Sequence, residues 1–330
     1  MSTPPIVSQY GGPPPYKLTN VEANINLFYS NIPFYPNQLN DLAIWLDGTD
    51  ILNNGSNNPA DGTAITAWAN KAPNSITVKQ DTIDYQPVFN SGVGVFFSNA
   101  NANAKINGLD TTYSSGQNET IFILINNRTT TNSYNLLYPT ITNGRQLYLD
   151  KTPNTLTTAK RPEGIILESG VVTNATPTLV SSWSSNVDGC NASLTVNHYI
   201  NGLLTGTFTK SEQYATGGNT LIGTDNYGAN GFNGDISEII IYSNVLSDSD
   251  RQKVESYLYW KWNTFTLDPS NPYRSEAYSN QVSLYPKIDS NIIPAVPRDL
   301  FSGEPTLDSR VYPLIQNFIQ LPNILKNSKF

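Results

Sequence analysis

The stretch Leu194-Thr-Val-Asn-His-Tyr-Ile-Asn-Gly-Leu-Leu-Thr-Gly-Thr-Phe208 decides the fold class. The dipeptide Asn201-Gly202 lies between two runs that are rich in β-branched, aromatic and other apolar residues, Leu194–Ile200 and Leu203–Phe208. Asn and Gly both tolerate positive φ angles, so this dipeptide favours the tight turn of a two-residue hairpin. The stretch therefore predicts two antiparallel strands joined by a turn.

Short apolar runs bounded by Asn, Gly, Ser or Pro continue on both sides of this hairpin. They are Leu42–Leu46, Gly94–Phe97, Thr120–Ile125, Leu136–Tyr138, Gln146–Leu149, Gly164–Leu167, Thr178–Trp183, Thr220–Gly223 and Asp235–Tyr242. Many short runs without alternating helices are typical of an antiparallel sandwich or barrel. One helix is expected after them, because Ser247 can cap it and Val254, Tyr257 and Leu258 share one helical face.

Composition divides the chain into three parts. Residues 1–40 hold proline runs, which favour an extended N-terminal arm. Residues 41–263 hold the predicted strands and helix. Residues 264–330 again combine many prolines with Ile, Leu, Phe and Tyr. This last part is too apolar for a disordered spacer, so it predicts a strap that lies on its own sandwich or on a neighbouring subunit.

Charge and residue counts argue against several kinds of function. The net charge is −7 and only 14% of the 330 residues are charged, which disfavours nucleic-acid binding. A single cysteine, Cys190, rules out an internal disulfide, and a single histidine, His198, leaves too few ligands for the usual zinc site. No run is apolar enough to span a membrane. The N-terminus lacks the pattern of a signal peptide, so the protein is expected to be made in the cytoplasm.

Two groups of motifs resemble a known family. Near the start are Ala43-Ile-Trp-Leu-Asp-Gly48, Trp68 and Asn70-Lys71; near the end are Phe232-Asn-Gly-Asp-Ile-Ser-Glu-Ile-Ile-Ile-Tyr242 and Val254-Glu-Ser-Tyr-Leu-Tyr-Trp-Lys-Trp262. Their order resembles concanavalin A-like, laminin G-like jelly-roll domains, of the subgroup seen in capsid-associated proteins of large DNA viruses (giant viruses). The resemblance covers about two thirds of the chain. It implies an all-β antiparallel sandwich, to which the sequence patterns above add one C-terminal helix and extended N- and C-terminal arms.

A glycosidase on this fold would need two neighbouring carboxylates, one of them acting as acid. The nearest pair is Asp235 and Glu238, which are three residues apart and point to opposite faces of a regular strand. No nucleophile motif accompanies His198, so a hydrogen-bonded strand histidine is expected there. We therefore predict no catalytic residues and no enzyme.

The resemblance also implies calcium as a possible cofactor; otherwise no cofactor is expected. Asp47 and Asp50, with Asp61, could supply carboxylate oxygens near the first turn. A second group is Asp225 with Asn226 and Asn230. Loop turns stabilised by these side chains are the alternative explanation.

A carbohydrate site would need aromatic rings beside amides, because a sugar stacks on a ring while amides bind its hydroxyls. The Gly-rich loop that holds Asn226, Tyr227, Asn230 and Phe232 is the candidate for such a site. Turn geometry explains the glycines of this loop equally well. The tryptophans are assigned mainly to the core: Trp45, Trp68, Trp183, Trp260 and Trp262.

Both arms hold residues that could bind partners. Pro13, Pro14, Pro15 and Tyr16 match the Pro-Pro-x-Tyr sequence that WW domains recognise, although a stiff segment explains it too. In the C-terminal strap, apolar side chains suited to a neighbouring surface include Tyr273, Tyr285 and Phe301.

Two functions follow as hypotheses. The first is a non-enzymatic structural protein of the virion, a minor capsid or cement protein. Its arms would tether it to other capsid proteins or to copies of itself. The alternative is a carbohydrate-binding, lectin-like surface module that binds glycans.

Overall fold

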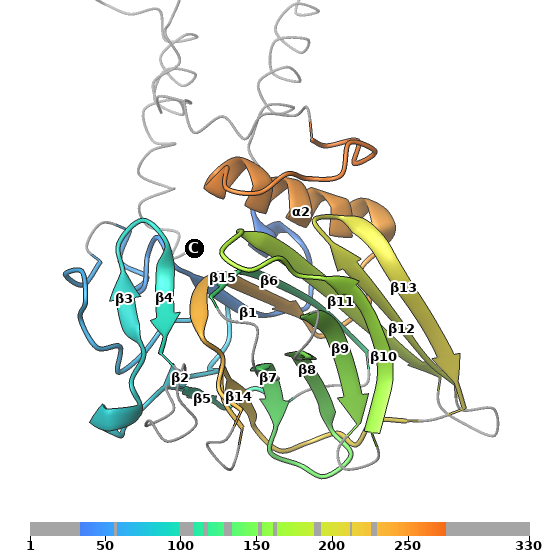
Figure 1. Ribbon diagram of the computed structural model, residues 1–330, viewed down its shortest axis with the longest axis horizontal. Coiled ribbons are helices and arrows are strands. Elements are labelled where there is room, and N and C mark those ends of the chain that lie inside the picture. The colour runs from blue at the N-terminus through green and yellow to red at the C-terminus, as the bar shows by residue number, and fades with distance from the viewer. Residues whose placement is uncertain are drawn as a thin grey trace, which may run out of the picture.

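Two antiparallel β-sheets stack face to face in the computed structural model of the chain (Figure 1). The structure describes residues 34–55, 58–98, 108–114, 118–128, 134–150, 154–160, 164–187, 193–211, 213–225 and 230–274. Sheet A has the strand order β13-β12-β11-β6-β15-β4-β3, with β1 also paired to β15. Its strands are β1 (Leu42–Asp47), β3 (Val88–Asn90), β4 (Gly94–Phe97), β6 (Glu119–Asn127), β11 (Thr178–Val187), β12 (Ser193–Ile200), β13 (Leu203–Lys210) and β15 (Gly234–Tyr242).

Sheet B has the order β10-β9-β8-β7-β14-β5-β2. Its strands are β2 (Val78–Lys79), β5 (Leu109–Thr111), β7 (Tyr134–Pro139), β8 (Arg145–Leu149), β9 (Thr155–Lys160), β10 (Gly164–Val171) and β14 (Thr220–Ile222). The helices are α2 (Asp248–Trp262) and the short 3-10 turns η1 (Pro36–Gln38) and η2 (Ile83–Tyr85). The predicted antiparallel sandwich with one C-terminal helix is confirmed. Within the described ranges, no helix combines the length and hydropathy that crossing a membrane requires.

The hairpin predicted at Asn201-Gly202 joins β12 to β13. Both residues have positive φ angles, 52° and 85°, as a tight two-residue turn requires. The side-chain oxygen of Asn201 accepts a hydrogen bond from the Leu179 backbone N–H at 2.8 Å. The turn is therefore fixed to the neighbouring strand β11 as well as closing its own hairpin.

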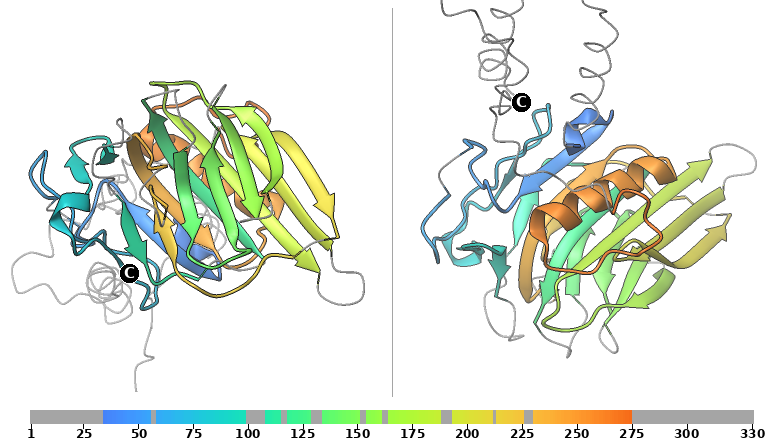
Figure 2. Two further views of the ribbon diagram at one scale, coloured as in Figure 1. Left: turned by 60° about the horizontal axis from the view of Figure 1, so that its bottom comes forward. Right: turned by 90° about the horizontal axis from the view of Figure 1, so that it is seen from above.

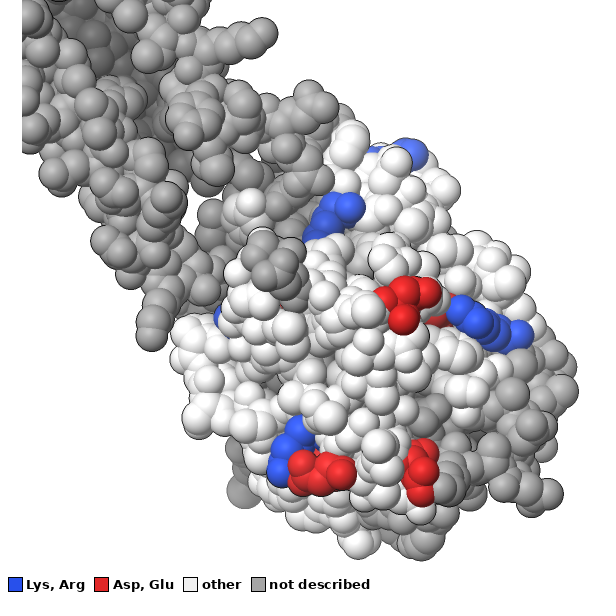
Figure 3. Space-filling view, turned by 90° about the vertical axis from the view of Figure 1, so that its left-hand side faces the viewer, with Lys and Arg blue, Asp and Glu red and all other residues white. Residues whose placement is uncertain are grey.

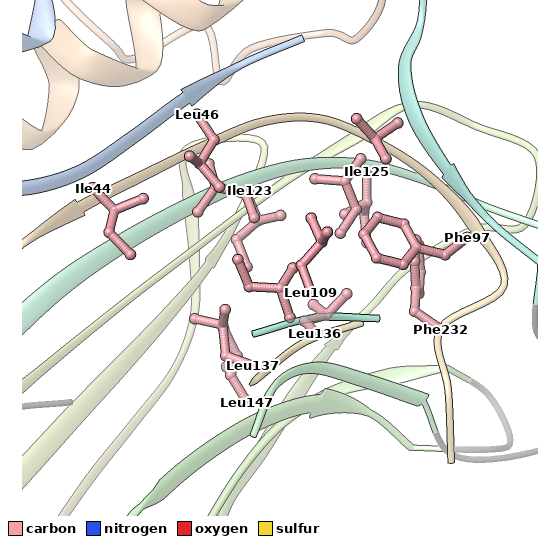
Figure 4. Close-up of a cluster of buried hydrophobic side chains, with 14 of the residues drawn as sticks. Ile44, Leu46, Phe97, Leu109, Ile123, Ile125, Leu136, Leu137, Leu147 and Phe232 are labelled. Atoms are coloured by element: carbon pink, nitrogen blue, oxygen red, sulfur yellow. The ribbon is translucent and has the colours of Figure 1, made fainter. Parts of the chain in front are cut away.

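The space between the sheets is apolar along the centre of sheet A. Alternate residues of β6, Ile121, Ile123 and Ile125, point into this core and are at most 2% exposed. They meet leucines from sheet B, such as Leu136 and Leu147 (Figure 4). Alternation of inward and outward side chains along each strand thus builds the core.

Toward β8 and β11 the same interior becomes polar. The Arg145 guanidinium donates to the Glu119 carboxylate at 3.0 Å, and both side chains are 1% exposed. Arg145 also donates to the hydroxyls of Ser182 and Ser184, and the Tyr113 hydroxyl donates to Glu119 at 2.7 Å. Hydrogen bonds from Tyr113 and to the two serines thus offset part of the cost of burying this ion pair.

Helix α2 begins where the sequence predicts, with Ser247 as its N-cap. The Ser247 hydroxyl accepts from the Asp250 backbone N–H at 3.1 Å. The helix packs on the outer face of sheet A, the face turned away from sheet B (Figure 2). There Val254 and Leu258 are fully buried against Phe122 and Ile240.

Two flanking segments, residues 34–40 and 264–274, also pack on this side of sheet A. Phe34 and Leu39 contact the α2 cluster, and Phe265 and Leu267 are buried in it. The boundary that composition places after residue 263 therefore falls inside packed structure. The rest of both arms, residues 1–33 and 275–330, lies outside the described residues.

Candidate functional site

Helix α2 crosses one end of the strands of sheet A. Its residues reach β12 through Arg251, whose guanidinium lies 4.0 Å from the centre of the Tyr199 ring. They reach β1 and β15 at the other end of the helix, where Lys261 and Trp262 contact Glu238. Toward the opposite end of β11, β12 and β13, no described element covers the outer face.

We call this open surface the β11–β13 face. Strand register places its side chains in two rows across the three strands: Trp183, Asn197 and Thr207, then Ser185, Thr195 and Thr209. Thr207 and Thr209 are exposed and the other four are half-buried. The face thus presents an indole ring, an amide and four hydroxyls, with no ionisable group.

Hydrogen bonds fix the two largest side chains of the β11–β13 face. The Trp183 Nε1–H donates to the Tyr199 hydroxyl at 3.3 Å, and the Asn197 amide donates to the same oxygen at 3.4 Å. Tyr199 is held from above by Arg251, which forms an ion pair with Glu255 at 2.6 Å. Burial raises the pKa of Glu255 to about 7, against the opposing effect of Arg251. The Trp183 indole is therefore held in one orientation before any ligand binds.

A buried network joins α2 to β1 and β15. Each oxygen of Glu238 accepts two hydrogen bonds: Oε1 from Trp45 and Tyr257, and Oε2 from Lys261 and Trp262, all at 2.6–2.9 Å. Burial raises the pKa of Glu238 and Lys261 opposes this effect. The four donors occupy the acceptor positions of this carboxylate and hold it between α2, β1 and β15.

Asp235 occupies a separate network. Its carboxylate accepts from Arg128 at 2.7 Å and from Asn90 at 2.8 Å. The expectation that Asp235 and Glu238 point to opposite faces is wrong, because a bulge shifts the register between Ile236 and Glu238. Both carboxylates lie on the outer face of sheet A, but each is engaged by its own cation. They therefore do not form the acid and nucleophile pair of a glycosidase.

Two of the residues predicted as calcium ligands, Asp47 and Asp50, contact the same lysine. Lys71 Nζ lies 2.7 Å from Asp47 and 3.0 Å from Asp50, and Lys261 lies 2.6 Å from Asp47. Burial alone would raise the pKa of Asp47, but Lys261 and Lys71 hold it well below its ordinary value. The donor set is thus neutralised by ammonium groups. Within the described residues no cluster of three or more His, Cys, Asp or Glu side chains could hold a metal ion.

The predicted carbohydrate loop is only partly described. Phe232 is fully buried and packs edge-on against Phe97, so its ring offers no face for a sugar. Asn230 donates to Asp225 at 2.7 Å, and its backbone oxygen accepts from Asn135. Asn226 and Tyr227 lie outside the described residues.

His198 lies inside the sandwich, fully buried. Its ring nitrogens contact the hydroxyls of Thr158 at 2.7 Å and Ser169 at 3.1 Å. Burial, with the nearby charge of Arg145, lowers the pKa of His198 to about 3. A neutral, buried histidine between hydroxyls is the strand histidine that the sequence predicts.

Of the predicted partner residues, only Tyr273 is described. Its hydroxyl lies 2.7 Å from that of Ser249 at the start of α2. Pro13, Pro14, Pro15, Tyr16, Tyr285 and Phe301 lie outside the described residues.

Sequence reasoning missed the β11–β13 face, because it assigned Trp183 to the core. A signal was present: the run Ser181-Ser-Trp-Ser-Ser185 surrounds the tryptophan with serines. Apolar neighbours are expected around a core tryptophan. Its cross-strand partner Asn197 is polar too, but that pairing is visible only in the structure.

Residues 111–250 match the family model described as the concanavalin A-like lectin/glucanases superfamily. This segment is less than half of the chain, holds most of the strands of both sheets and is similar to domains of that superfamily. No curated protein is similar enough to the chain to count as a match.

Solved structures similar to this chain include three proteins from different organisms. Domain 4 of an extracellular arabinanase from Geobacillus stearothermophilus, solved with arabinotriose, is 16% identical, with 64% of this chain and 96% of that chain covered and a TM-score of 0.40. A SAP-like pentraxin from Limulus polyphemus is 18% identical, with 46% and 76% covered and a TM-score of 0.37. A CBM40 module of a Ruminococcus gnavus sialidase, bound to sialyllactose, is 20% identical, with 41% and 81% covered and a TM-score of 0.33. At these scores the likeness carries no argument about ligands.

Proposed function

We propose that this protein is a non-enzymatic, lectin-like module that binds carbohydrate on the β11–β13 face. One observation carries the proposal: Trp183 lies on a sheet surface that no described element covers, and hydrogen bonding holds it beside an amide and four hydroxyls. The apolar C–H face of a sugar ring stacks on an indole, while hydroxyls and amides exchange hydrogen bonds with its O–H groups.

The absence of charge on the β11–β13 face favours a neutral sugar over an anionic ligand. Its six residues are Trp, Asn, Ser and Thr, and the basic side chain closest in the network, Arg251, is turned onto the Tyr199 ring. A nucleic acid or acidic ligand would need exposed Lys or Arg. On another side of the molecule, too, charged side chains are few and scattered (Figure 3). Binding should therefore depend little on salt.

A glycan microarray probed with the full chain tests this proposal. We expect selective binding to a set of neutral glycans and its loss in Trp183→Ala, because stacking contributes about 1–3 kcal/mol in such sites. Tyr85→Ala is the matched control, since Tyr85 is an exposed aromatic residue (43%) on η2, outside this face. Equal glycan binding by wild type and Trp183→Ala would reject the β11–β13 face as the site.

A second candidate is structural: a minor capsid or cement protein of a large DNA virus, localised in the virion. It is favoured by the two flanking segments, 34–40 and 264–274, which pack on the same side of the sandwich around α2. Continuations of the chain from both segments start on one side, where they could bind a common neighbour such as another capsid protein or a second copy.

Deleting residues 275–330 tests this second candidate. The deletion must start after Arg274, because Leu267 and Asn271 belong to the packed domain. A tether predicts unchanged thermal stability together with loss of oligomers, or of co-purification with virus particles. If the shortened protein still assembles like the full chain, the tether is not in this segment.

A further inference from the structure

A hollow of about 370 Å³ lies on the outer face of sheet B, on the opposite side of the sandwich from the β11–β13 face. It is formed where β2, β5 and β14 run side by side (Figure 1). Strand register places Lys79 beside Asp110 and Asp110 beside Leu221. Their chain neighbours Leu109 and Ile222 point into the core, so Asp110 and Leu221 point outward.

The Asp110 carboxylate is the chemically notable group of this hollow. It is exposed, and no hydrogen bond or ion pair within the described residues engages it. The neighbouring Lys79 ammonium lies 2.6 Å from Asp81 instead. Lys79 attracts the Asp110 carboxylate only through its nearby charge. A carboxylate whose oxygens accept no hydrogen bond within the described residues can accept two at once from adjacent hydroxyls of one ligand.

The walls of the hollow are built from hydroxyls and amides that are already fixed. On one side, the Thr140 hydroxyl bonds the backbone N–H and C=O of Asn219 at 2.8 and 3.0 Å. On the other, the Thr112 hydroxyl accepts from the Thr77 backbone N–H at 2.9 Å. Such walls need no rearrangement when a ligand enters, which lowers the entropy cost of binding.

The hollow also has an apolar surface of limited size. Leu221 lines it and is 9% exposed. One apolar side chain surrounded by hydroxyls, an amide and a carboxylate matches the amphipathic surface of a single sugar ring. A fatty ligand would find too little apolar surface. An anion would meet the Asp110 carboxylate, while the Lys79 ammonium of the lining is already paired with Asp81.

We propose that this hollow is a second carbohydrate site, which takes one neutral monosaccharide unit through its vicinal hydroxyls, with Asp110 as their acceptor. The inference extends the proposed function, but it depends on different residues and on the other sheet. Two sites on opposite faces would let one molecule bind two glycan chains.

Backbone amide NMR of the full chain tests the proposal with glucose, galactose, mannose, N-acetylglucosamine and fucose as probes. We expect at least one sugar to shift the amides of Lys79, Asp110 and Asn219 in a saturable way. Asp110→Asn keeps the shape but replaces a charged acceptor by an amide, so its Kd should rise about tenfold or more. Glu168→Gln, on the opposite edge strand of sheet B, removes the same charge and should leave the Kd unchanged.

Trp183→Ala separates this site from the β11–β13 face. Sugar-induced shifts at Asp110 that persist in Trp183→Ala support two independent sites, whether or not that variant still binds glycans on the microarray. Absence of these shifts with all five sugars overturns the second site. So does an Asp110→Asn protein that binds as tightly as wild type, and either result leaves the test of Trp183 intact.

Discussion

Tryptophan side chains lie on both parts of the outer face of sheet A, the part under α2 and the open β11–β13 face, but in different surroundings. Under α2, the indoles of Trp45 and Trp262 donate to one buried carboxylate, Glu238, and pack against neighbouring side chains. On the β11–β13 face, Trp183 donates to Tyr199 and no described helix covers its ring. The comparison teaches that residue type alone does not assign a tryptophan to core or to surface; the element packed above it does.

A large loss of stability is expected from breaking the Glu238 network. In Glu238→Gln, an NH2 group replaces one carboxylate oxygen that accepts two hydrogen bonds. The N–H or O–H groups that donated to this oxygen then have no acceptor. Urea denaturation should show a loss of about 3 kcal/mol in the free energy of unfolding. Glu168→Gln, on an exposed strand residue, should change it by less than about 0.5 kcal/mol.

A smaller loss is expected at the segment that follows α2. Leu267 is fully buried beside Gly202 at the hairpin turn, so Leu267→Ala should cost about 2–3 kcal/mol of unfolding free energy. Leu204→Ala is the control, because Leu204 lies on β13 and is 49% exposed. Equal, small effects of the two variants would mean that residues 264–274 do not stabilise the domain.

Acid should weaken the sandwich through His198, on the inner side of β12. The unfolded chain takes up a proton near the ordinary histidine pKa of 6.5, while burial keeps the folded histidine neutral down to about pH 3. Stability present above pH 6.5 is therefore lost as the pH falls, by about 1.5 kcal/mol between pH 6.5 and 5.

The His198→Gln variant isolates this contribution from other groups. Glu255 acts in the opposite direction, since its raised pKa near 7 favours the folded state as the pH falls. Only the difference between wild type and His198→Gln is assigned to the histidine. If both proteins lose stability equally between pH 6.5 and 5, His198 is protonated in the folded state.

The smallest effect on stability is expected for Trp183. Trp183→Ala should lower the free energy of unfolding by no more than about 1 kcal/mol, because the indole is half-buried and no described helix covers it. Trp68→Ala should cost about 3–5 kcal/mol, because Trp68 is fully buried and donates to the Asp47 backbone oxygen. Similar losses for the two variants would place Trp183 in the core after all.

Local sequence signals predict the hairpin and the helix start correctly. Asn201-Gly202 and Ser247 act through their own backbone geometry and nearest neighbours, which are visible in the chain. The motifs near Trp45 and Lys261 also locate a real feature, since their residues meet around Glu238.

Features that depend on tertiary contacts were not predictable. The bulge that turns Asp235 and Glu238 to one face arises from pairing with β6, and no residue type in the strand predicts it. The pairing of Asp47 and Asp50 with Lys71 likewise depends on chain segments that meet only in the fold. In the sequence, acidic residues near a turn therefore resemble a metal site. In the structure, a lysine lies between their carboxylates.

The pairing of β1 with β15 has a consequence for synthesis of the protein. Trp45 and its partner Glu238 are 193 residues apart, and all six residues of β1 are buried in the finished sheet. On the ribosome, nearly the whole domain must be synthesised before β15, the partner strand of β1, emerges. During that interval its apolar side chains are open to solvent and to other nascent chains. Pairing of β1 is thus delayed until β15 has been synthesised, and β1 is the segment that a chaperone would need to shield.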